Sequence, residues 1–268
     1  MTKLKEFIKQ HNKVLLIAVI LGAILLTWKF INSFSETTTS SAWDGVVAKE
    51  FTSGTGTIEN PYVISDASEF AYFKSLMEGE DASVYANKNY KITNSFNYGE
   101  YDLAINNEIP FAGTIDGLGN AIYNAKVTNG LFNSLDGATL KNIKFSSLNI
   151  EADKNTGILS TTSNDSTILS IIIEGNVQAL DNDEEFILAG ITYEDTSSEF
   201  DNVVINVMVN EDVNYVSVIG ETENTTTNNI LVKTGYDYTL TDIKLENETQ
   251  FKKLGFFLGS DTNDKLCG

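Results

Sequence analysis

Short apolar runs separated by polar turns make up most of the chain from Phe111 onward. The runs contain β-branched residues in alternating or continuous order, and the turns are rich in Asn, Asp, Gly, Ser and Thr. This pattern is typical of short β-strands joined by tight turns. A helical period is almost absent after Gly79, and the chain holds only 2 prolines. The pattern therefore predicts an all-β fold for most of the chain.

The strand pattern also repeats along the chain. Four units begin at residues 130, 157, 190 and 217, so their spacings are 27, 33 and 27 residues. In each unit a polar residue precedes the second strand; these residues are Asn142, Ser170, Asn202 and Asn229. Fixed periods of this length indicate a stacked array. The four polar residues either form a ladder at one corner of the stack or are ordinary turn residues.

We therefore predict a parallel β-helix, a solenoid of β-rungs, over residues 89–241, with residues 89–93 as its first strand. Each rung of such a stack pairs with its neighbours and buries its inward residues in a shared core. The rival fold is an antiparallel β-sandwich of immunoglobulin type. A sandwich needs turn signals every ~8–12 residues and commonly lacks a residue-level repeat, so the repeat favours the solenoid.

One helix is predicted before the first rung. Asp66 is a suitable N-cap, and Glu69 stands three residues later as its capping-box partner. Gly79 is expected to end the helix. Four apolar residues line one helical face, namely Phe70, Phe73, Leu76 and Met77. Residues 61–64 read as a short edge strand, so residues 43–88 are predicted to form a small N-terminal helical cap over the open end of the stack.

The first 42 residues carry the pattern of a membrane anchor. Residues 1–13 are basic, and residues 14–31 form an apolar run interrupted only by Lys29. This run is long enough to span a bilayer, and the basic flank places residues 1–13 in the cytoplasm. Residues 32–42 are Ser/Thr-rich and read as a polar stalk. The alternative is a cleaved signal peptide with its cleavage site near Ala42, which would release a secreted protein.

Charge narrows the range of partners. The formal net charge is −19, no arginine occurs, and from Trp43 onward 13 lysines face 35 acidic residues. Such a surface repels nucleic acid and anionic lipid headgroups. Cys267 is the single cysteine and His11 the single histidine, so the sequence has neither an internal disulfide nor a cysteine metal cluster.

Catalytic chemistry has few candidate residues. A lyase base would have to be a lysine such as Lys126, Lys141 or Lys144, and Asp116 could serve as one of two hydrolase carboxylates. Each has an ordinary explanation, since exposed lysines are common and Asp116 precedes a glycine turn. Two acidic clusters either bind calcium or form solvated loops; they comprise Asp181, Asp183, Glu184 and Glu185, and Asp261, Asn263 and Asp264. We assign no catalytic, cofactor or metal residue and do not expect an enzyme.

A further set of motifs occurs in a characteristic order. They are Trp43-Asp44-Gly45, the Gly54 and Gly56 turn before Pro61, the capped helix, Phe111 to Ile122 with its glycines, and Gly130-Leu131-Phe132 followed by Leu140-Lys141-Asn142-Ile143. This order resembles bacterial cell-surface right-handed parallel β-helix proteins with GLUG-type repeats, well over residues 43–150 and loosely beyond. The resemblance implies a right-handed β-helix in a secreted or surface-attached protein, often part of an adhesin. It implies location and fold more than activity.

The sequence thus predicts a single-pass membrane protein whose extracytoplasmic β-helix acts as a surface binding, adhesion or structural module. Its partners would be the membrane and either a surface glycan or a protein. Two alternatives remain, a carbohydrate-active β-helix enzyme and an accessory subunit of a cell-surface or secretion assembly. Residues 242–268 contain clustered Phe and Leu and are predicted to be a C-terminal cap, with a docking patch for a partner as the alternative.

Overall fold

The structure is a computed structural model that describes residues 40–180, 187–209, 214–216, 218–234 and 237–241. Within these ranges, no helix has both the length and the apolar character needed to cross a bilayer. The predicted span at residues 14–31 lies outside the described residues. So do the predicted C-terminal cap at residues 242–268 and most of the stalk.

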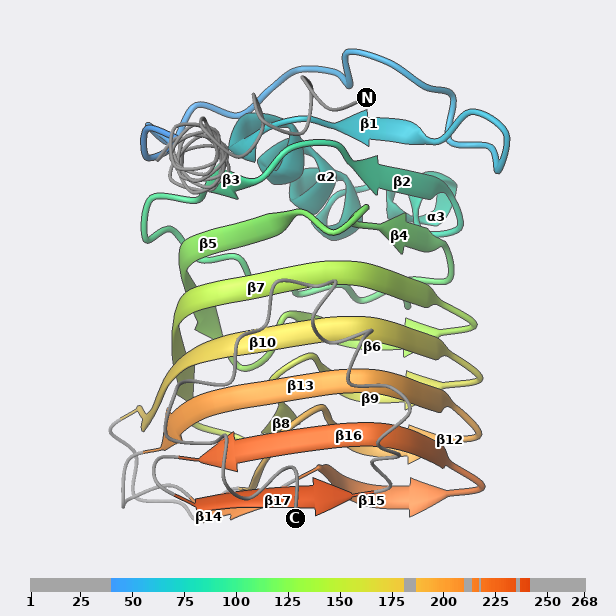
Figure 1. The fold of residues 1–268 in the computed structure, drawn as a ribbon. Helices are drawn as coiled ribbons and strands as arrows, with labels where there is room; N and C mark the ends of the chain where they lie inside the picture. Colours follow the sequence, from blue (N-terminus) through green and yellow to red (C-terminus); the bar gives the residue numbers. More distant parts are fainter. Residues whose placement is uncertain (1–39, 181–186, 210–213, 217, 235–236, 242–268) are drawn as a thin grey trace, which may run out of the picture. The chain divides into compact units, whose positions relative to one another are not determined.

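Three β-sheets, built mainly of parallel strands, form the fold (Figure 1). The large sheet follows the order β1 (Tyr62–Ile64), β2 (Asn89–Ile92), β4 (Thr114–Asp116), β7 (Thr139–Ala152), β10 (Thr167–Ala179), β13 (Glu199–Val209), β16 (Thr226–Thr234) and β17 (Asp237–Thr241), and β5 (Ala121–Thr128) joins β3 (Phe96–Asn97) to β7. The second sheet contains β6 (Phe132–Asp136), β9 (Ser160–Asn164), β12 (Thr192–Thr196) and β15 (Ile219–Glu223). The third contains β8 (Thr156–Gly157), β11 (Ile187–Ala189) and β14 (Asn214–Val216).

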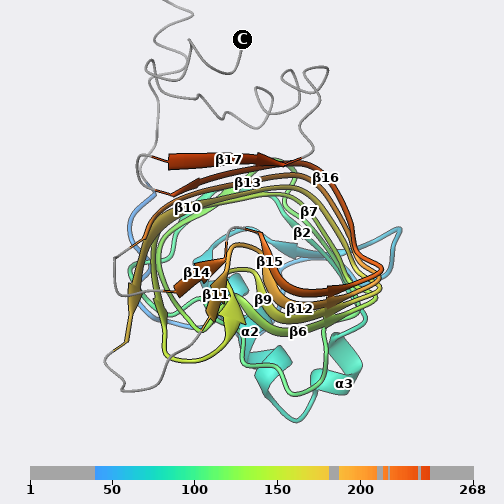
Figure 2. The same ribbon diagram turned by 90° about the horizontal axis from the view of Figure 1, so that it is seen from below.

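From β6 to β16 each turn of the chain contributes one strand to each sheet, so the described part is an all-β, β-helix-like stack (Figure 2). All strand pairs are parallel except β16 with β17, which is antiparallel. The expectation of a mostly parallel β-stack is confirmed. The antiparallel sandwich considered as its rival is not the fold.

The spacing between rungs differs slightly from the spacing predicted from the sequence. Thr139 aligns with Thr167, Glu199 and Thr226, so successive rungs advance by 28, 32 and 27 residues. Gly157 aligns with Ala189 rather than with Gly190. Counted from the first unit, the third and fourth units begin at residues 190 and 217 as predicted, since Phe132 aligns with Ser160, Thr192 and Ile219. Only the second unit is displaced, and it begins at residue 158, one later than predicted, because the inward-facing strand residues set the register and the neighbouring Gly157 does not.

The four predicted corner residues occupy equivalent places in the stack. Asn142, Ser170, Asn202 and Asn229 have φ values of 57°, 57°, 57° and 55°. Each interrupts the strand register at the same point. This left-handed backbone suits Asn and is tolerated by short polar residues. The turn reading therefore describes this corner, and the side-chain amides of Asn142 and Asn229 donate to Asp116 and Asp201.

Helix α2 (Ala67–Glu78) forms as predicted at the N-terminal end of the stack (Figure 1). The Asp66 carboxylate accepts a hydrogen bond from the Glu69 N–H at 3.0 Å, and Gly79 is the C-cap. Glu69 does not complete the predicted capping box with Asp66. Its buried carboxylate instead accepts the N–H groups of Ser65 and Thr52 at 2.7 and 2.8 Å. A second short helix, α3 (Ala82–Tyr85), follows where only one helix was predicted.

The buried interior along the second sheet changes from apolar to polar side chains from one rung to the next. At the β6 rung it presents Phe132, Leu135 and Ala138. In the next two rungs the corresponding residues are Ser160, Ser163 and Ser166, then Thr192, Asp195 and Ser198. All nine are buried, and hydroxyl contacts join the rungs, such as Ser163 Oγ to Ser198 Oγ at 3.0 Å. The core is therefore apolar at the N-terminal end and increasingly polar on this side toward the C-terminal end.

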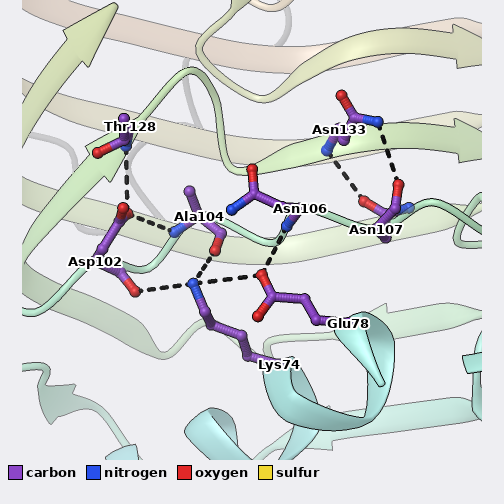
Figure 3. A network of polar contacts seen from close by, with 8 residues as sticks. All are labelled: Lys74, Glu78, Asp102, Ala104, Asn106, Asn107, Thr128 and Asn133. Atoms are coloured by element: carbon purple, nitrogen blue, oxygen red, sulfur yellow. Dashed lines mark hydrogen bonds and ion pairs between the residues drawn. The ribbon is translucent and has the colours of Figure 1, made fainter. Parts of the chain in front are cut away.

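A lysine joins α2 to the loop between β3 and β4 (Figure 3). Lys74 Nζ donates to the carbonyl oxygen of Asp102 at 3.3 Å and to that of Ala104. It also pairs with Glu78, whose Oε1 lies 3.5 Å away and accepts the Asn106 N–H at 2.8 Å. The loop supplies the first-rung contacts to the second sheet, so this network fixes the helix against the stack.

Lys74→Met is expected to destabilise the fold, because it removes the donor to two carbonyl groups. Leaving a buried acceptor unsatisfied costs roughly 1–3 kcal/mol, so a loss of about 2–4 kcal/mol in the free energy of unfolding is expected. Urea unfolding measures it. Lys49→Met, at an exposed lysine of the same N-terminal region, is the control and should change stability by less than ~0.5 kcal/mol.

Candidate functional site

Strands β5, β7 and β10 run side by side in the large sheet (Figure 1). A polar groove lies on the outer face of these strands. Its volume is about 570 Å³, and it is lined by Glu100, Asn124, Ala125, Lys126, Ser147, Leu148, Asn149 and Asn176. Six of these eight side chains are polar. We call this feature the polar groove.

Strand register aligns the central row of the groove. Lys126 pairs with Asn149, and Asn149 pairs with Asn176. Adjacent strands lie ~4.8 Å apart, so the three side chains form a row with this spacing along the stack. Asn149 and Asn176 are exposed, whereas the residues on either side of Asn149, Leu148 and Ile150, are buried. The row therefore points outward while its strands hold the core.

One nearly buried carboxylate organises the edge of the groove. Glu151 Oε2 lies 2.6 Å from Lys126 Nζ. Glu151 Oε1 accepts hydrogen bonds from the side-chain amides of Asn149 and Gln178, each at 3.1 Å. The hydrogen bond to Lys126 is the main cause that lowers the pKa of Glu151, and the same bond raises the pKa of Lys126. These contacts fix the positions of the Lys126 and Asn149 side chains.

Glu151→Gln is expected to flatten the acid dependence of stability. The folded-state pKa of Glu151 lies below its unfolded value of ~4.3. The ionised carboxylate therefore adds to the free energy of unfolding above pH ~4.3, and this stabilisation is lost as the pH falls through the folded pKa. Lys126 acts in the opposite pH range, because its folded-state pKa is raised. The stabilisation from its protonated amine is present below pH ~10.4 and is lost as the pH rises through the folded pKa.

Urea unfolding at pH 7 and pH 3 measures this effect. The parent should lose more stability between the two values than Glu151→Gln does. Glu223→Gln, at an exposed carboxylate, should keep the parent's pH dependence. An equal loss in the parent and in Glu151→Gln would contradict the role given to the ion pair.

All three lysines considered as catalytic bases lie in ion pairs. Besides the Lys126 pair, Lys141 Nζ lies 3.4 Å from Asp116 Oδ2 and Lys144 Nζ lies 2.8 Å from Glu174 Oε2. A base must be able to lose its proton, and the carboxylate beside Lys126 stabilises the protonated amine. The geometry thus gives these lysines structural partners between strands.

Asp116 occupies a turn that also links two rungs. Its Oδ1 accepts the Leu118 N–H at 2.9 Å and the Asn142 side-chain amide at 3.0 Å. Asp201 repeats the arrangement further along, where its Oδ1 accepts the Asn229 amide at 2.8 Å. The turn explanation therefore accounts for the Asp116 contacts. A smaller hollow of about 300 Å³ adjoins Asp116, and its lining includes Ile58, Lys91 and Leu118.

Neither acidic cluster considered for calcium lies in the described part of the chain, and His11 and Cys267 also fall outside it. Within the described ranges, no group of three or more His, Cys, Asp and Glu side chains is placed to hold a metal ion.

Sequence reasoning did not single out Asn149 or Asn176. Asn149 follows its corner residue Asn142 by 7 positions, whereas Asn176 follows Ser170 by 6, because the pairing of β7 with β10 shifts by one residue between Ile173 and Gly175. Equal offsets from the corner therefore do not mark this row in the sequence.

Comparisons with protein-family models, with curated proteins and with solved structures found no match to this chain. The resemblance to surface β-helix proteins with GLUG-type repeats therefore stays a prediction.

Proposed function

We propose that this chain is a surface binding module, a right-handed β-helix with a small N-terminal helical cap that recognises a neutral glycan along the polar groove. The observation that carries the proposal is the aligned row of Lys126, Asn149 and Asn176 across three strands. Amide side chains both donate and accept hydrogen bonds, which suits the hydroxyl groups of a sugar.

Charge favours a neutral glycan over an acidic one. Lys126 is neutralised by Glu151, and Glu100 also lines the groove. From Trp43 onward the chain carries 22 more acidic residues than lysines, since 35 face 13. Long-range repulsion therefore acts against nucleic acid and acidic polysaccharides.

A glycan array probed with the full-length protein in detergent tests the ligand class. The parent is expected to bind one or more neutral glycans, and Asn149→Ala with Asn176→Ala should weaken that binding at least ~10-fold, which corresponds to about 1.4 kcal/mol. Asn106→Ala, at an exposed asparagine beside α2, is the matched control and should bind like the parent. Absence of glycan binding, or equal binding by the double variant, would overturn the proposal.

We also propose that residues 14–31 anchor the module in the cell membrane, with residues 1–13 in the cytoplasm and the β-stack outside. The apolar length and the basic flank support this arrangement. Mass spectrometry of the protein from membranes should find the intact N-terminus. A mature chain that begins near Trp43 would instead show cleavage and secretion.

A further inference from the structure

Three apolar side chains form a stripe on the outer face of the large sheet. Ile172 on β10 pairs with Val204 on β13, and Val204 pairs with Leu231 on β16. Lys144 on β7 precedes them in the same row and pairs with Glu174. We call Ile172, Val204 and Leu231 the outer stripe.

The outer stripe faces away from the core. Side chains alternate between the two faces of a strand, and Ile171 and Ile173, the neighbours of Ile172, both belong to the core cluster. Val203 and Ile205 flank Val204 in the same way, and none of the three stripe residues belongs to that cluster.

The outer stripe is nevertheless buried. Ile172 and Val204 are 0% exposed, and Leu231 is 5% exposed. Further along the same face of β13, Met208 is 53% exposed. An uncovered outer face leaves its side chains open to water, as Met208 is, so the burial of the stripe requires a second layer over this part of the sheet.

We propose that residues 242–268 of the same chain supply this layer. The preceding strand β17 ends at Thr241, which pairs with Ile230, the residue next to Leu231. The segment therefore leaves the sheet beside the stripe. It contains five large apolar residues within eight positions, namely Phe251, Leu254, Phe256, Phe257 and Leu258.

The segment is long enough for this placement. Its 27 residues can reach up to ~90 Å when extended, whereas three neighbouring strands span only ~10 Å. The tether also gives the segment a high effective concentration at the stripe. The apolar cluster expected to cap the end of the stack would thus cover the outer face of β10, β13 and β16 instead.

Thiol labelling tests the proposal in the full-length protein. Cys267→Ser removes the single native thiol, and Val204→Cys then reports on the outer stripe, while Met208→Cys reports on open surface of the same strand. Val204→Cys should react with a maleimide at least ~100-fold more slowly than Met208→Cys, as protection by a bound segment requires. Adding Phe256→Asp and Phe257→Asp should raise the rate at position 204 by ~10-fold or more and leave the rate at position 208 unchanged.

Three results would overturn the proposal. In the first, Val204→Cys reacts as fast as Met208→Cys with the C-terminal segment unaltered. In the second, position 204 stays protected in the Phe256→Asp and Phe257→Asp variant, which would assign the cover to another segment. In the third, protection is lost on dilution, which would assign it to a second copy of the chain. Circular dichroism of each variant confirms that the β-stack itself is retained.

Discussion

Gly157→Ala is expected to destabilise the stack by more than about 3 kcal/mol, at the high end of the range for overpacked sites. A Cβ at this position would lie 2.3 Å from both the Ile191 carbonyl oxygen and the Thr192 Cα, and 2.6 Å from the Ser160 carbonyl oxygen. All three are backbone atoms, which cannot move aside as a flexible side chain can. The substitution must therefore separate β8 from the next rung, where Gly157 pairs with Ala189.

Gly137→Ala is the matched control for this prediction. Gly137 has a φ of +71°, but a Cβ there would meet no atom within 4 Å. Only the strain of the left-handed backbone remains, at roughly 1–2 kcal/mol. Urea unfolding of the two variants separates contact from backbone strain. Equal losses in both would show that the close approach at Gly157 is not what makes glycine necessary.

Phe73→Ala is expected to cost about 3–5 kcal/mol, the usual range for removing a buried phenyl ring. Phe73 is fully buried on α2, and its ring centre lies 4.6 Å from that of Tyr90 and 5.9 Å from that of Phe111. These two partners belong to the first rungs of the stack. The helix therefore shares one core with the strands, and the cavity would weaken both.

Tyr101→Ala provides the comparison for Phe73→Ala. Tyr101 is 44% exposed, and its ring packs edge-on against Trp43 at 4.8 Å. Its loss should cost no more than ~1.5 kcal/mol, the upper value for one aromatic pair. Thermal or urea unfolding measures both variants. A Phe73→Ala variant as stable as Tyr101→Ala would mean that α2 lies against the stack without supporting it.

Local signals in the sequence predicted the elements well. Asp66 and Gly79 bound α2 because caps depend on a few neighbouring residues, and the buried face of that helix follows from its period. The corner at Asn142 and its equivalents was also visible, since short polar residues recur wherever the backbone turns left-handed. The start of the second rung was off by one residue, whereas the third and fourth were correct. Pairing depends on contacts with the neighbouring rung, which a small-residue motif does not report.

The polar groove lay beyond such signals. Lys126 and Asn149 are 23 positions apart and Asn149 and Asn176 are 27 apart, so only the final register brings them into one row. Outward-facing polar residues follow no hydrophobic period, because solvent-exposed positions are not constrained by packing in the core. Asp116, which a glycine-rich motif made conspicuous, is explained by its turn contacts.

The change from apolar to hydroxyl-bearing residues inside the second sheet has a consequence for how the stack opens. Each serine or threonine that replaces a large apolar residue removes buried apolar area and adds a hydrogen bond that is worth less. Asp195 deepens the effect, because its Oδ1 is buried and has no hydrogen-bond partner within the described part of the chain. Cohesion between rungs therefore decreases from β6 toward β15. In a one-dimensional array this gradient makes unfolding directional, so the C-terminal rungs are expected to separate first while the aromatic N-terminal rungs stay folded. The folded N-terminal rungs then serve as the template on which the C-terminal rungs pair again.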